Sequence, residues 1–179
     1  MRFRAELWDW IKTITIAVII VVILHFFVFN LSTVEGRSME PTLIENDWLF
    51  VNKLAYKLGN PKLGDIVILE DPYPEETTSA AKKKFLVKRV VGLPGDRIEI
   101  SGGKLYRNGD PMKETYTDSP IEDLNFGPVV VQNNCYFVMG DNRHAHASLD
   151  SRVFHAVPKR LIVGRADFIL WPYKQISVL

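Results

Sequence analysis

One serine of the chain, Ser38, has the surroundings of a candidate nucleophile. It lies in the segment GRSMEPTL at residues 36–43, where Gly36 permits an unusual backbone conformation before it and Pro41 restricts the chain after it. A nucleophilic serine needs an exposed hydroxyl on a tightly held turn, with backbone N–H groups nearby to stabilise an oxyanion. By itself, however, the segment favours the simpler interpretation of a serine in a linker.

A lysine that could act as a general base, Lys88, interrupts an apolar run together with Arg89. The run reads FLVKRVVG at residues 85–92, and the alternation of side chains along a strand would point one of the two cations toward the interior. Burial disfavours a charged amine, and a pKa lowered by about two or three from its usual value of about 10.4 would make a competent base. The alternative is an edge strand with both cations in solvent.

A third segment, VMGDNRHAHASLDSRVF at residues 138–154, is dense in Asp, Asn, Arg and Ser. The residues that could form a network of ion pairs are Asp141, Arg143, Asp150 and Arg152. Ser148 or Ser151 could donate a hydrogen bond to a lysine amine. Taken alone, the segment is equally compatible with a polar loop.

Other patterns that could indicate catalysis or metal binding are weaker. Ser101 and Lys104 have the Ser-x-x-Lys spacing of β-lactamases, but the companion motifs are missing and the two glycines between them predict a turn. His144 and His146, with His155, could be metal ligands, but the pair lies in a loop containing Gly, Asn and Ala, so we expect no metal and no other cofactor.

Composition excludes several classes of protein. A net charge of +1 over 179 residues gives no basic surface for nucleic acid, so we expect no nucleic-acid partner. Cys135 is the single cysteine, which excludes an internal disulfide and a multi-cysteine metal site. We expect it to pack as a small apolar residue.

An apolar segment near the N-terminus predicts a membrane anchor. Residues 13–29 read TITIAVIIVVILHFFVF, and with Leu31 the segment can cross a hydrocarbon core of about 30 Å as a helix. A cleavable secretory signal or a buried helix is the alternative. The apolar run is longer than the roughly 7–15 residues of a cleavable signal, and no clean small-x-small site follows it.

The flanking residues predict the orientation of this anchor. Trp8 and Trp10 lie where an interfacial aromatic belt is expected, and the basic residues around the segment are mostly on its N-terminal side. Those residues are Arg2, Arg4 and Lys12 before the segment and Arg37 after it. We therefore expect a cytoplasmic tail at residues 1–12, a single transmembrane helix at 13–31 and an extracytoplasmic domain at 32–179.

The rest of the chain predicts a mostly antiparallel β domain. Short apolar or alternating runs are separated by turn signals, and Asn108-Gly109 suits the positive φ angles of a type I′ turn. The runs are residues 48–52, 65–69, 85–91, 97–100, 104–107, 129–131, 136–139 and 166–170. The polar residues 75–84 predict an exposed loop, in which Lys82–84 could contact anionic lipid and Ser79-Ala80-Ala81 could be a site of self-cleavage.

Four segments resemble, in order and wording, the sequence boxes of type I signal peptidases, and most closely their Gram-positive subgroup. They are SMEPTL after the apolar segment, GDIVIL at residues 64–69, VKRVVGLPGD at 87–96 and GDNR…SLDSR at 140–152. The resemblance covers about residues 8–172. It implies a β-rich catalytic domain behind a membrane anchor, with an inserted β-ribbon at about residues 97–134.

The resemblance also implies roles for individual residues. Ser38 would be the nucleophile and Lys88 the general base of a serine–lysine dyad, with Met39 lining the substrate channel and Ser148 orienting the lysine amine. The residues implied to brace this architecture are Arg89, Asp141, Arg143, Asp150 and Arg152.

Two departures from the family pattern stand out. Gly36 replaces a serine that donates a hydroxyl in some members, which leaves the oxyanion to backbone N–H groups, chiefly that of Ser38. Four residues, His144–Ala147, separate Arg143 from Ser148 where the family usually has two, and this bears directly on where Ser148 lies.

The implied activity is removal of signal peptides from secreted preproteins after small-x-small (Ala-x-Ala) sites. The partners implied are preprotein signal peptides, the plasma membrane and, by proximity, the secretion translocase. An apolar rim near Trp48, Leu49 and Phe50 could rest on the bilayer.

Two rival interpretations remain at this level. Self-cleaving serine–lysine repressor proteases share the dyad, but they are soluble and bind DNA. A membrane-tethered β domain that binds secreted chains without cutting them would fit if the insertion at 144–147 misplaced the dyad.

Overall fold

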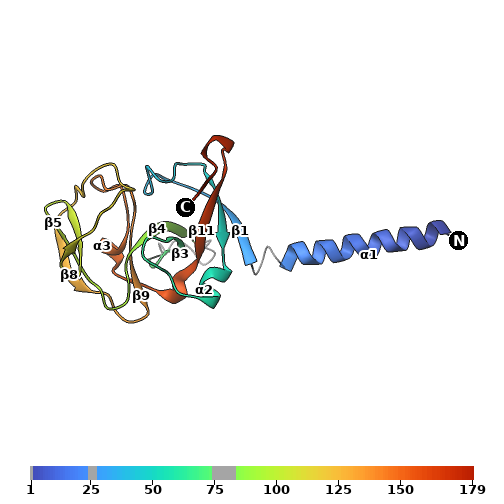
Figure 1. Cartoon of the computed structure of the whole chain (residues 1–179), viewed down its shortest axis with the longest axis horizontal. Coiled ribbons are helices and arrows are strands. Elements are labelled where there is room, and N and C mark those ends of the chain that lie inside the picture. The colour runs from blue at the N-terminus through green and yellow to red at the C-terminus, as the bar shows by residue number, and fades with distance from the viewer. Residues whose placement is uncertain (1, 24–27, 74–83) are drawn as a thin grey trace.

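The structure, a computed structural model, describes residues 2–23, 28–73 and 84–179. Within these ranges the chain consists mainly of antiparallel strands in two sheets, from which helix α1 (Arg2–Ile23) extends away (Figure 1). The prediction of a mostly β domain after the N-terminal segment is confirmed.

Helix α1 covers only part of the predicted anchor at residues 13–31. None of the helices in the described part of the chain is both long and apolar enough to cross a membrane. Residues 24–27 of the predicted span lie outside the described residues, as do residues 75–83 with the predicted lipid contact at Lys82 and Lys83 and the self-cleavage site at 79–81.

The larger sheet is a curled array of antiparallel strands (Figure 1). Its order is β1 (Phe29–Thr33), β2 (Trp48–Asn52), β11 (Ile162–Trp171), β3 (Ile66–Glu70), β4 (Phe85–Gly92), β9 (Cys135–Met139) and β10 (Val157–Pro158), with β12 (Ser177–Val178) paired to β11. Strands β4 and β9 are neighbours, with Arg89 opposite Met139. Strand β4 carries Lys88 and Arg89, and β9 ends just before the segment GDNR at residues 140–143.

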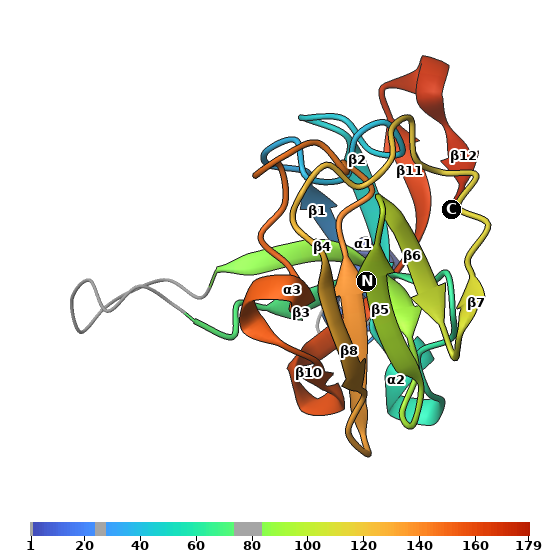
Figure 2. The ribbon, with the colours of Figure 1, turned by 90° about the vertical axis from the view of Figure 1, so that its left-hand side faces the viewer.

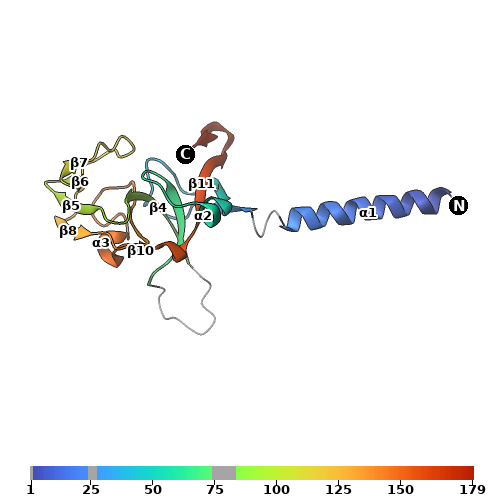
Figure 3. The same cartoon turned by 60° about the horizontal axis from the view of Figure 1, so that its bottom comes forward.

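The smaller sheet lies within the range 97–134 that the resemblance assigns to an inserted ribbon. Its order is β7 (Asp110–Pro111), β6 (Lys104–Arg107), β5 (Arg97–Ser101) and β8 (Phe126–Val130). Asn108 and Gly109, with φ angles of 57° and 94°, close the β6–β7 hairpin, so the predicted Asn-Gly turn is confirmed. This sheet lies at the end of the molecule remote from α1 (Figures 1 and 3).

The two sheets share a hydrophobic cluster that buries one face of β9, and a second cluster buries its other face. Phe137 and Met139 pack with Ile98 and Ile100 of β5, whereas the alternate residue Val138 packs in a second cluster inside the larger sheet. Cys135 belongs to the shared cluster, so its predicted role as a small packed residue is confirmed. Figure 2, which looks at this end, shows β5 and β8 in front of the larger sheet.

Short helices fill the connections. They are α2 (Leu54–Leu58), α3 (Ser151–Phe154) and the 3₁₀ turns η2 (Lys159–Leu161) and η3 (Tyr173–Gln175). The carboxylate of Asp150 caps α3 by accepting the N–H of Arg152, so this residue of the Asp/Arg-rich box has a local role at a helix N-terminus.

Candidate active site

The structure brings Ser38 and Lys88 together although 50 positions separate them in the chain. The Nζ atom of Lys88 lies 2.6 Å from Oγ of Ser38 and donates to the carbonyl of Val87 at 2.9 Å. Lys88 comes from β4 and Ser38 from the turn after β1. The four-residue segment His144–Ala147 therefore leaves the two side chains in hydrogen-bond contact.

Lys88 is only 2% exposed, and this burial lowers its pKa from 10.5 to about 8. The charges of Asp150 and Asp141 oppose the decrease, and that of Arg152 supports it. At pH 7 about a tenth of a lysine with this pKa is neutral, against less than about 0.1% of an ordinary lysine. The site therefore supplies a neutral amine next to a hydroxyl.

The expectation that alternation turns one of the two cations inward is confirmed for Lys88, and Arg89, which it did not include, is buried as well. Strand alternation does place Lys88 and Arg89 on opposite faces of β4, but both are buried, at 2% and 9% exposure. The reason is that β4 is a central strand with both faces covered, one by the Ser38 turn and the other by Asp141 and Tyr116.

The turn that carries Ser38 is held by hydrogen bonds from Asn142 and by apolar packing of its own side chains. Asn142 donates its backbone N–H to the Ser38 carbonyl at 3.1 Å and its side-chain amide to the Arg37 carbonyl at 3.0 Å. Met39 and Leu43, the apolar residues of the turn, are buried in the larger sheet's core. Ser38 therefore lies on a turn held by hydrogen bonds and apolar packing rather than in an open linker.

Gly36 begins this turn with a φ angle of +82°, in the region that favours glycine. Its N–H faces the Glu45 carboxylate at 3.4 Å. Within the described residues, the N–H of Ser38 donates to no backbone or side-chain acceptor.

An open groove of about 470 Å³ runs past the dyad. Its walls come from β1 and the segment after it, from the Ser38 turn and from the beginning of β4, and Met39 is among its lining residues. The lining residues are Leu31–Gly36, Ser38, Met39, Ile68 and Lys84–Lys88. Among the strands that the structure describes, β1 pairs with β2 alone and so lies at the edge of the larger sheet, where its residues 31–33 line this groove.

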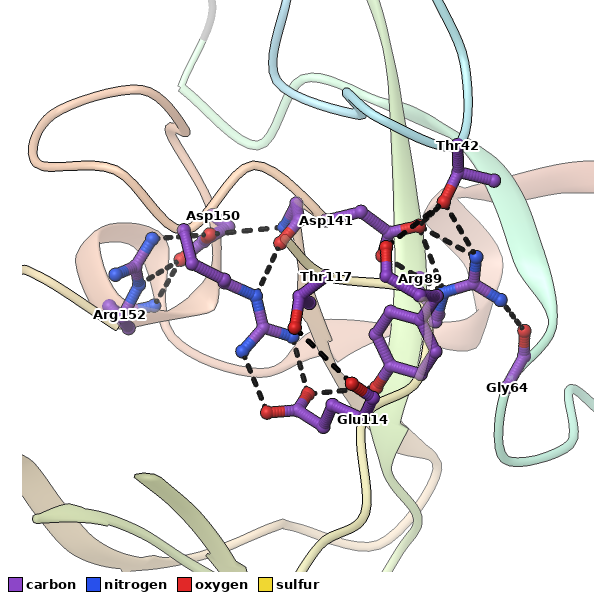
Figure 4. Close-up of polar contacts among 11 residues, drawn as sticks. Thr42, Gly64, Arg89, Glu114, Thr117, Asp141, Asp150 and Arg152 are labelled. Carbon is purple, nitrogen blue, oxygen red and sulfur yellow. Dashed lines mark hydrogen bonds and ion pairs between the residues drawn. The ribbon is translucent and has the colours of Figure 1, made fainter. Parts of the chain in front are cut away.

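Arg89 and Asp141 form a buried ion pair beside the dyad (Figure 4). The Nη2 atom of Arg89 donates to Oδ2 of Asp141 at 2.6 Å, and Nη1 donates to the Gly64 carbonyl at 2.9 Å. Asp141 also accepts the hydroxyl of Thr42 at 2.6 Å, which ties the Ser38 turn to the end of β9. The guanidinium stacks 4.1 Å above the Tyr116 ring.

The remaining two arginines of the site, Arg143 and Arg152, pair with carboxylates that were not predicted from the sequence. Arg143 donates to both oxygens of Glu114, and Arg152 donates to Asp150 and, through Nη1, to Asp123. Figure 4 shows Glu114 and the Asp150–Arg152 pair in one continuous network. Glu114 and Asp123 belong to no family box, and only the fold places them here.

Ser148 does not make the contact implied for it. Its hydroxyl is buried and has no hydrogen-bond partner among the described residues, and no hydrogen bond joins it to Lys88. It does lie in the dyad's surroundings, because a Cβ built on Gly140 would stand 2.4 Å from Oγ of Ser148 and 2.3 Å from the Ser38 carbonyl. Ser151, the other candidate, accepts the N–H of Val138 at 2.9 Å.

The insertion at His144–Ala147 is held by the loop before β8. Nδ1 of His144 lies 3.0 Å from Oε1 of Glu122, and the N–H of Ala145 donates to Oε2 of Glu122 and lowers the pKa of that carboxyl. Within the described ranges, no three His, Cys, Asp or Glu side chains gather as metal ligands. Ser101 and Lys104 face each other across the β5–β6 turn, so the predicted turn is confirmed.

Comparisons of the sequence with a family model and with known relatives show one family. The family model described as "Signal peptidase, peptidase S26" matches residues 7–171. "Signal peptidase I P" of Bacillus subtilis subsp. natto is 41% identical over 98% of this chain and 95% of its own length, and "Signal peptidase I" of Bacillus caldolyticus is 39% identical over 97% and 94%. A solved signal peptidase I from Enterococcus faecalis aligns with 59% of this chain and 96% of its own, at 27% identity and a TM-score of 0.46.

Proposed function

Because the chain belongs to the signal peptidase family, peptidase S26, and is therefore a peptide-bond hydrolase, we propose that it removes signal peptides from preproteins with Ser38 as nucleophile and Lys88 as general base. The observation that carries the proposal is the 2.6 Å contact between Nζ of Lys88 and Oγ of Ser38. A buried amine with a lowered pKa is the group that this role requires.

The reaction follows from these positions. Neutral Lys88 takes the proton of the Ser38 hydroxyl as its oxygen attacks the carbonyl carbon of the scissile peptide bond. The backbone N–H of Ser38 donates to the oxyanion of the tetrahedral intermediate. Protonated Lys88 then gives its proton to the departing amine, which leaves an acyl-enzyme ester on Ser38. A water molecule, deprotonated by Lys88, hydrolyses the ester and releases the signal peptide with a carboxyl end.

The groove supports an extended substrate. An extended chain that adds to the open edge of β1 would have its backbone hydrogen bonds satisfied and every second side chain turned into the groove. Met39, Ile68 and Val87 line that groove with apolar surface. We infer small residues at −1 and −3, and hence Ala-x-Ala sites, from the family resemblance together with this apolar wall.

We also propose that the protein acts at the plasma membrane. The support is the apolar sequence of residues 13–31 and the positive charges before it, which favour a cytoplasmic N-terminus and an extracytoplasmic catalytic domain. Enzyme and preprotein anchored in one bilayer would meet at a raised effective concentration, close to the translocase that delivers the substrate.

The predicted apolar rim needs one correction. Leu49 is fully buried in the sheet core and cannot contact lipid, because alternation along β2 turns it inward. Trp48 is 47% exposed, and Trp171, opposite it on β11, is 54% exposed. We propose that these two tryptophans, with Phe168 and Leu170, form the surface that rests on the bilayer.

The experiment uses the detergent-solubilised full chain and a preprotein with an Ala-x-Ala site. We expect wild type to cut after the −1 alanine, with product termini read by mass spectrometry, and Ser38→Ala and Lys88→Ala to lose nearly all activity. Ser101→Ala and Lys104→Ala, the serine and lysine of the β5–β6 turn, are matched controls that should cut normally. Binding without cleavage by wild type would favour a tethered binding protein, and cleavage by Ser38→Ala would place the nucleophile elsewhere.

A further inference from the structure

One segment of the inserted region, residues 113–123, reaches back to the active site; it is called the clasp here. It lies between β7 and β8. Its side chains contact all three arginines of the site: Glu114 pairs with Arg143, Asp123 with Arg152, and the Tyr116 ring lies under Arg89. Three contacts from eleven consecutive positions indicate a specific docking of this segment.

The first contact fixes the carbonyl of Gly140. Glu114 accepts two hydrogen bonds from Arg143, with Nη1 to Oε2 at 3.0 Å and Nη2 to Oε1 at 2.5 Å. The side chains of Arg143 and Glu114 are 1% and 11% exposed, so solvent does little to replace either partner. The third nitrogen, Nε of Arg143, donates to the Gly140 carbonyl at 2.8 Å. Glu114 therefore orients the guanidinium that holds this carbonyl.

The second contact fixes the N–H of the same glycine. Asp150 accepts the Gly140 N–H at 3.2 Å, and Arg152 holds Asp150 through Nε at 2.8 Å and Nη2 at 2.9 Å. Nη1 of Arg152 donates to Oδ2 of Asp123 at 2.5 Å. Arg152 thus bridges Asp150, which binds Gly140, and Asp123, which belongs to the clasp.

Gly140 is the residue against which the nucleophile turn rests. A Cβ at this position would lie 2.3 Å from the Ser38 carbonyl, and two residues later Asn142 donates its N–H to that same carbonyl. The N–H of Gly140 is held by Asp150 and its carbonyl by Arg143, and residues of the clasp orient both partners. A displacement of Gly140 would therefore move the Ser38 backbone relative to Lys88.

We propose that Glu114 and Asp123 are positioning residues for Ser38: from the inserted region, they fix Gly140 through Arg143 and through Arg152 with Asp150. The proposal rests on the proposed function, since it assigns a role in cleavage by Ser38. Neither carboxylate contacts the dyad. Their effect is to keep the attacking oxygen in line with the substrate carbonyl, and errors of about 1 Å in such geometry reduce rates by about 100-fold.

The test compares Glu114→Gln and Asp123→Asn in the full chain, each of which keeps the side-chain size and removes the charge. We expect kcat on the Ala-x-Ala preprotein to fall by about 100-fold for Glu114→Gln, with a smaller fall for Asp123→Asn, and KM to stay within about twofold of wild type. Asp123→Glu, which restores the charge at a partly exposed position, should regain most of the lost kcat.

Glu99→Gln is the matched control, because Glu99 lies in the same region and pairs with Arg97 in solvent at 3.4 Å. Its kcat should equal that of wild type. Thermal melts are recorded for every variant, and if Glu114→Gln does not fold, Asp123→Asn decides. A folded Asp123→Asn with wild-type kcat, or a loss confined to KM, would overturn the positioning role. Absence of cleavage by wild type itself would instead overturn the proposed function, and the positioning role with it.

Discussion

At the residue scale, the feature that controls the site is the burial of one amine. Burial lowers the pKa of Lys88 to about 8, although Asp150 and Asp141 lie close enough to oppose this. The unfolded chain would hold the proton up to a pKa of 10.5. Below about pH 8 the folded protein therefore carries a charged amine in a buried site, and its stability rises as the pH increases from about 8 to 10.5. Activity and stability gain from the same deprotonation.

This predicts the pH dependence of cleavage. The value of kcat/KM should rise from pH 6 to a plateau above about pH 9, with an apparent pKa near 8, because only the neutral amine can accept the Ser38 proton. Initial rates on the Ala-x-Ala preprotein across this range measure it. Asp71, whose charge also raises the pKa of Lys88, offers a matched variant: Asp71→Asn should move the profile to lower pH without removing activity. A profile that is flat between pH 7 and 9 would contradict the assignment of Lys88.

At the element scale, the site depends on the end of β9. This strand is buried on both faces. The residues that follow it, Gly140–Asn142, pack against the Ser38 turn and bind it by hydrogen bonds. Asp141 binds the turn through Thr42, and Asn142 binds it through the carbonyls of Arg37 and Ser38. These hydrogen bonds hold the Ser38 turn against the end of a buried strand.

Gly140→Ala tests this dependence. The added methyl would lie 2.3 Å from the Ser38 carbonyl, so the turn must shift, and we expect kcat to fall by about 100-fold and stability by about 1–3 kcal/mol. Activity assays and urea unfolding measure the two effects. Gly109→Ala is the control, since Gly109 has a positive φ angle but open space around it and should lose only about 1 kcal/mol of stability, with kcat unchanged. Normal activity of Gly140→Ala would show that the turn tolerates displacement.

At the scale of the whole molecule, the two sheets differ in what they contribute to the site. The larger sheet carries the dyad, the groove and, at its β1–β2–β11 side, the exposed tryptophans, while α1 extends from this side and the smaller sheet lies at the opposite end (Figures 1 and 3). If the apolar N-terminal sequence enters the bilayer, as proposed, the β1–β2–β11 side of the larger sheet faces the membrane and the smaller sheet lies at the far end of the molecule (Figure 1). A membrane-held signal peptide would then reach Ser38 without crossing the smaller sheet.

Fluorescence quenching checks this orientation. In a Trp8→Phe/Trp10→Phe background the only tryptophans left are Trp48 and Trp171. We expect brominated lipids in reconstituted vesicles to quench their emission, because both indoles are about half exposed on the surface proposed to meet the bilayer. Vesicles of the same lipid without bromine are the control. Emission unchanged by bromination would place this surface in water and remove the proposed bilayer contact.

The sequence alone determined the class of the domain and the positions of its main strands, because short alternating runs and Gly-containing turns are local signals. Taken singly, the segments around Ser38 and Lys88 did not distinguish a catalytic pair from a linker and an edge strand, and the family resemblance of the boxes led to the predicted dyad. Trp48–Asn52 and Lys104–Arg107 were predicted with their observed bounds, and the turns at Asn108 and Ser101 were predicted correctly.

Only the tertiary structure decided which groups surround the dyad. Burial of both Lys88 and Arg89 follows from the central place of β4 in the sheet, which alternation along one strand does not specify. The partners of Arg143 and Arg152, Glu114 and Asp123, come from the folding of the inserted region onto β9, and each lies 29 positions from its arginine with no motif around it. The hydroxyl of Ser148, which has no hydrogen-bond partner among the described residues, also depends on this packing, since the residues before it are held by Glu122 and Asp123. Local patterns fix elements, whereas long-range contacts between charged side chains depend on how the elements pack.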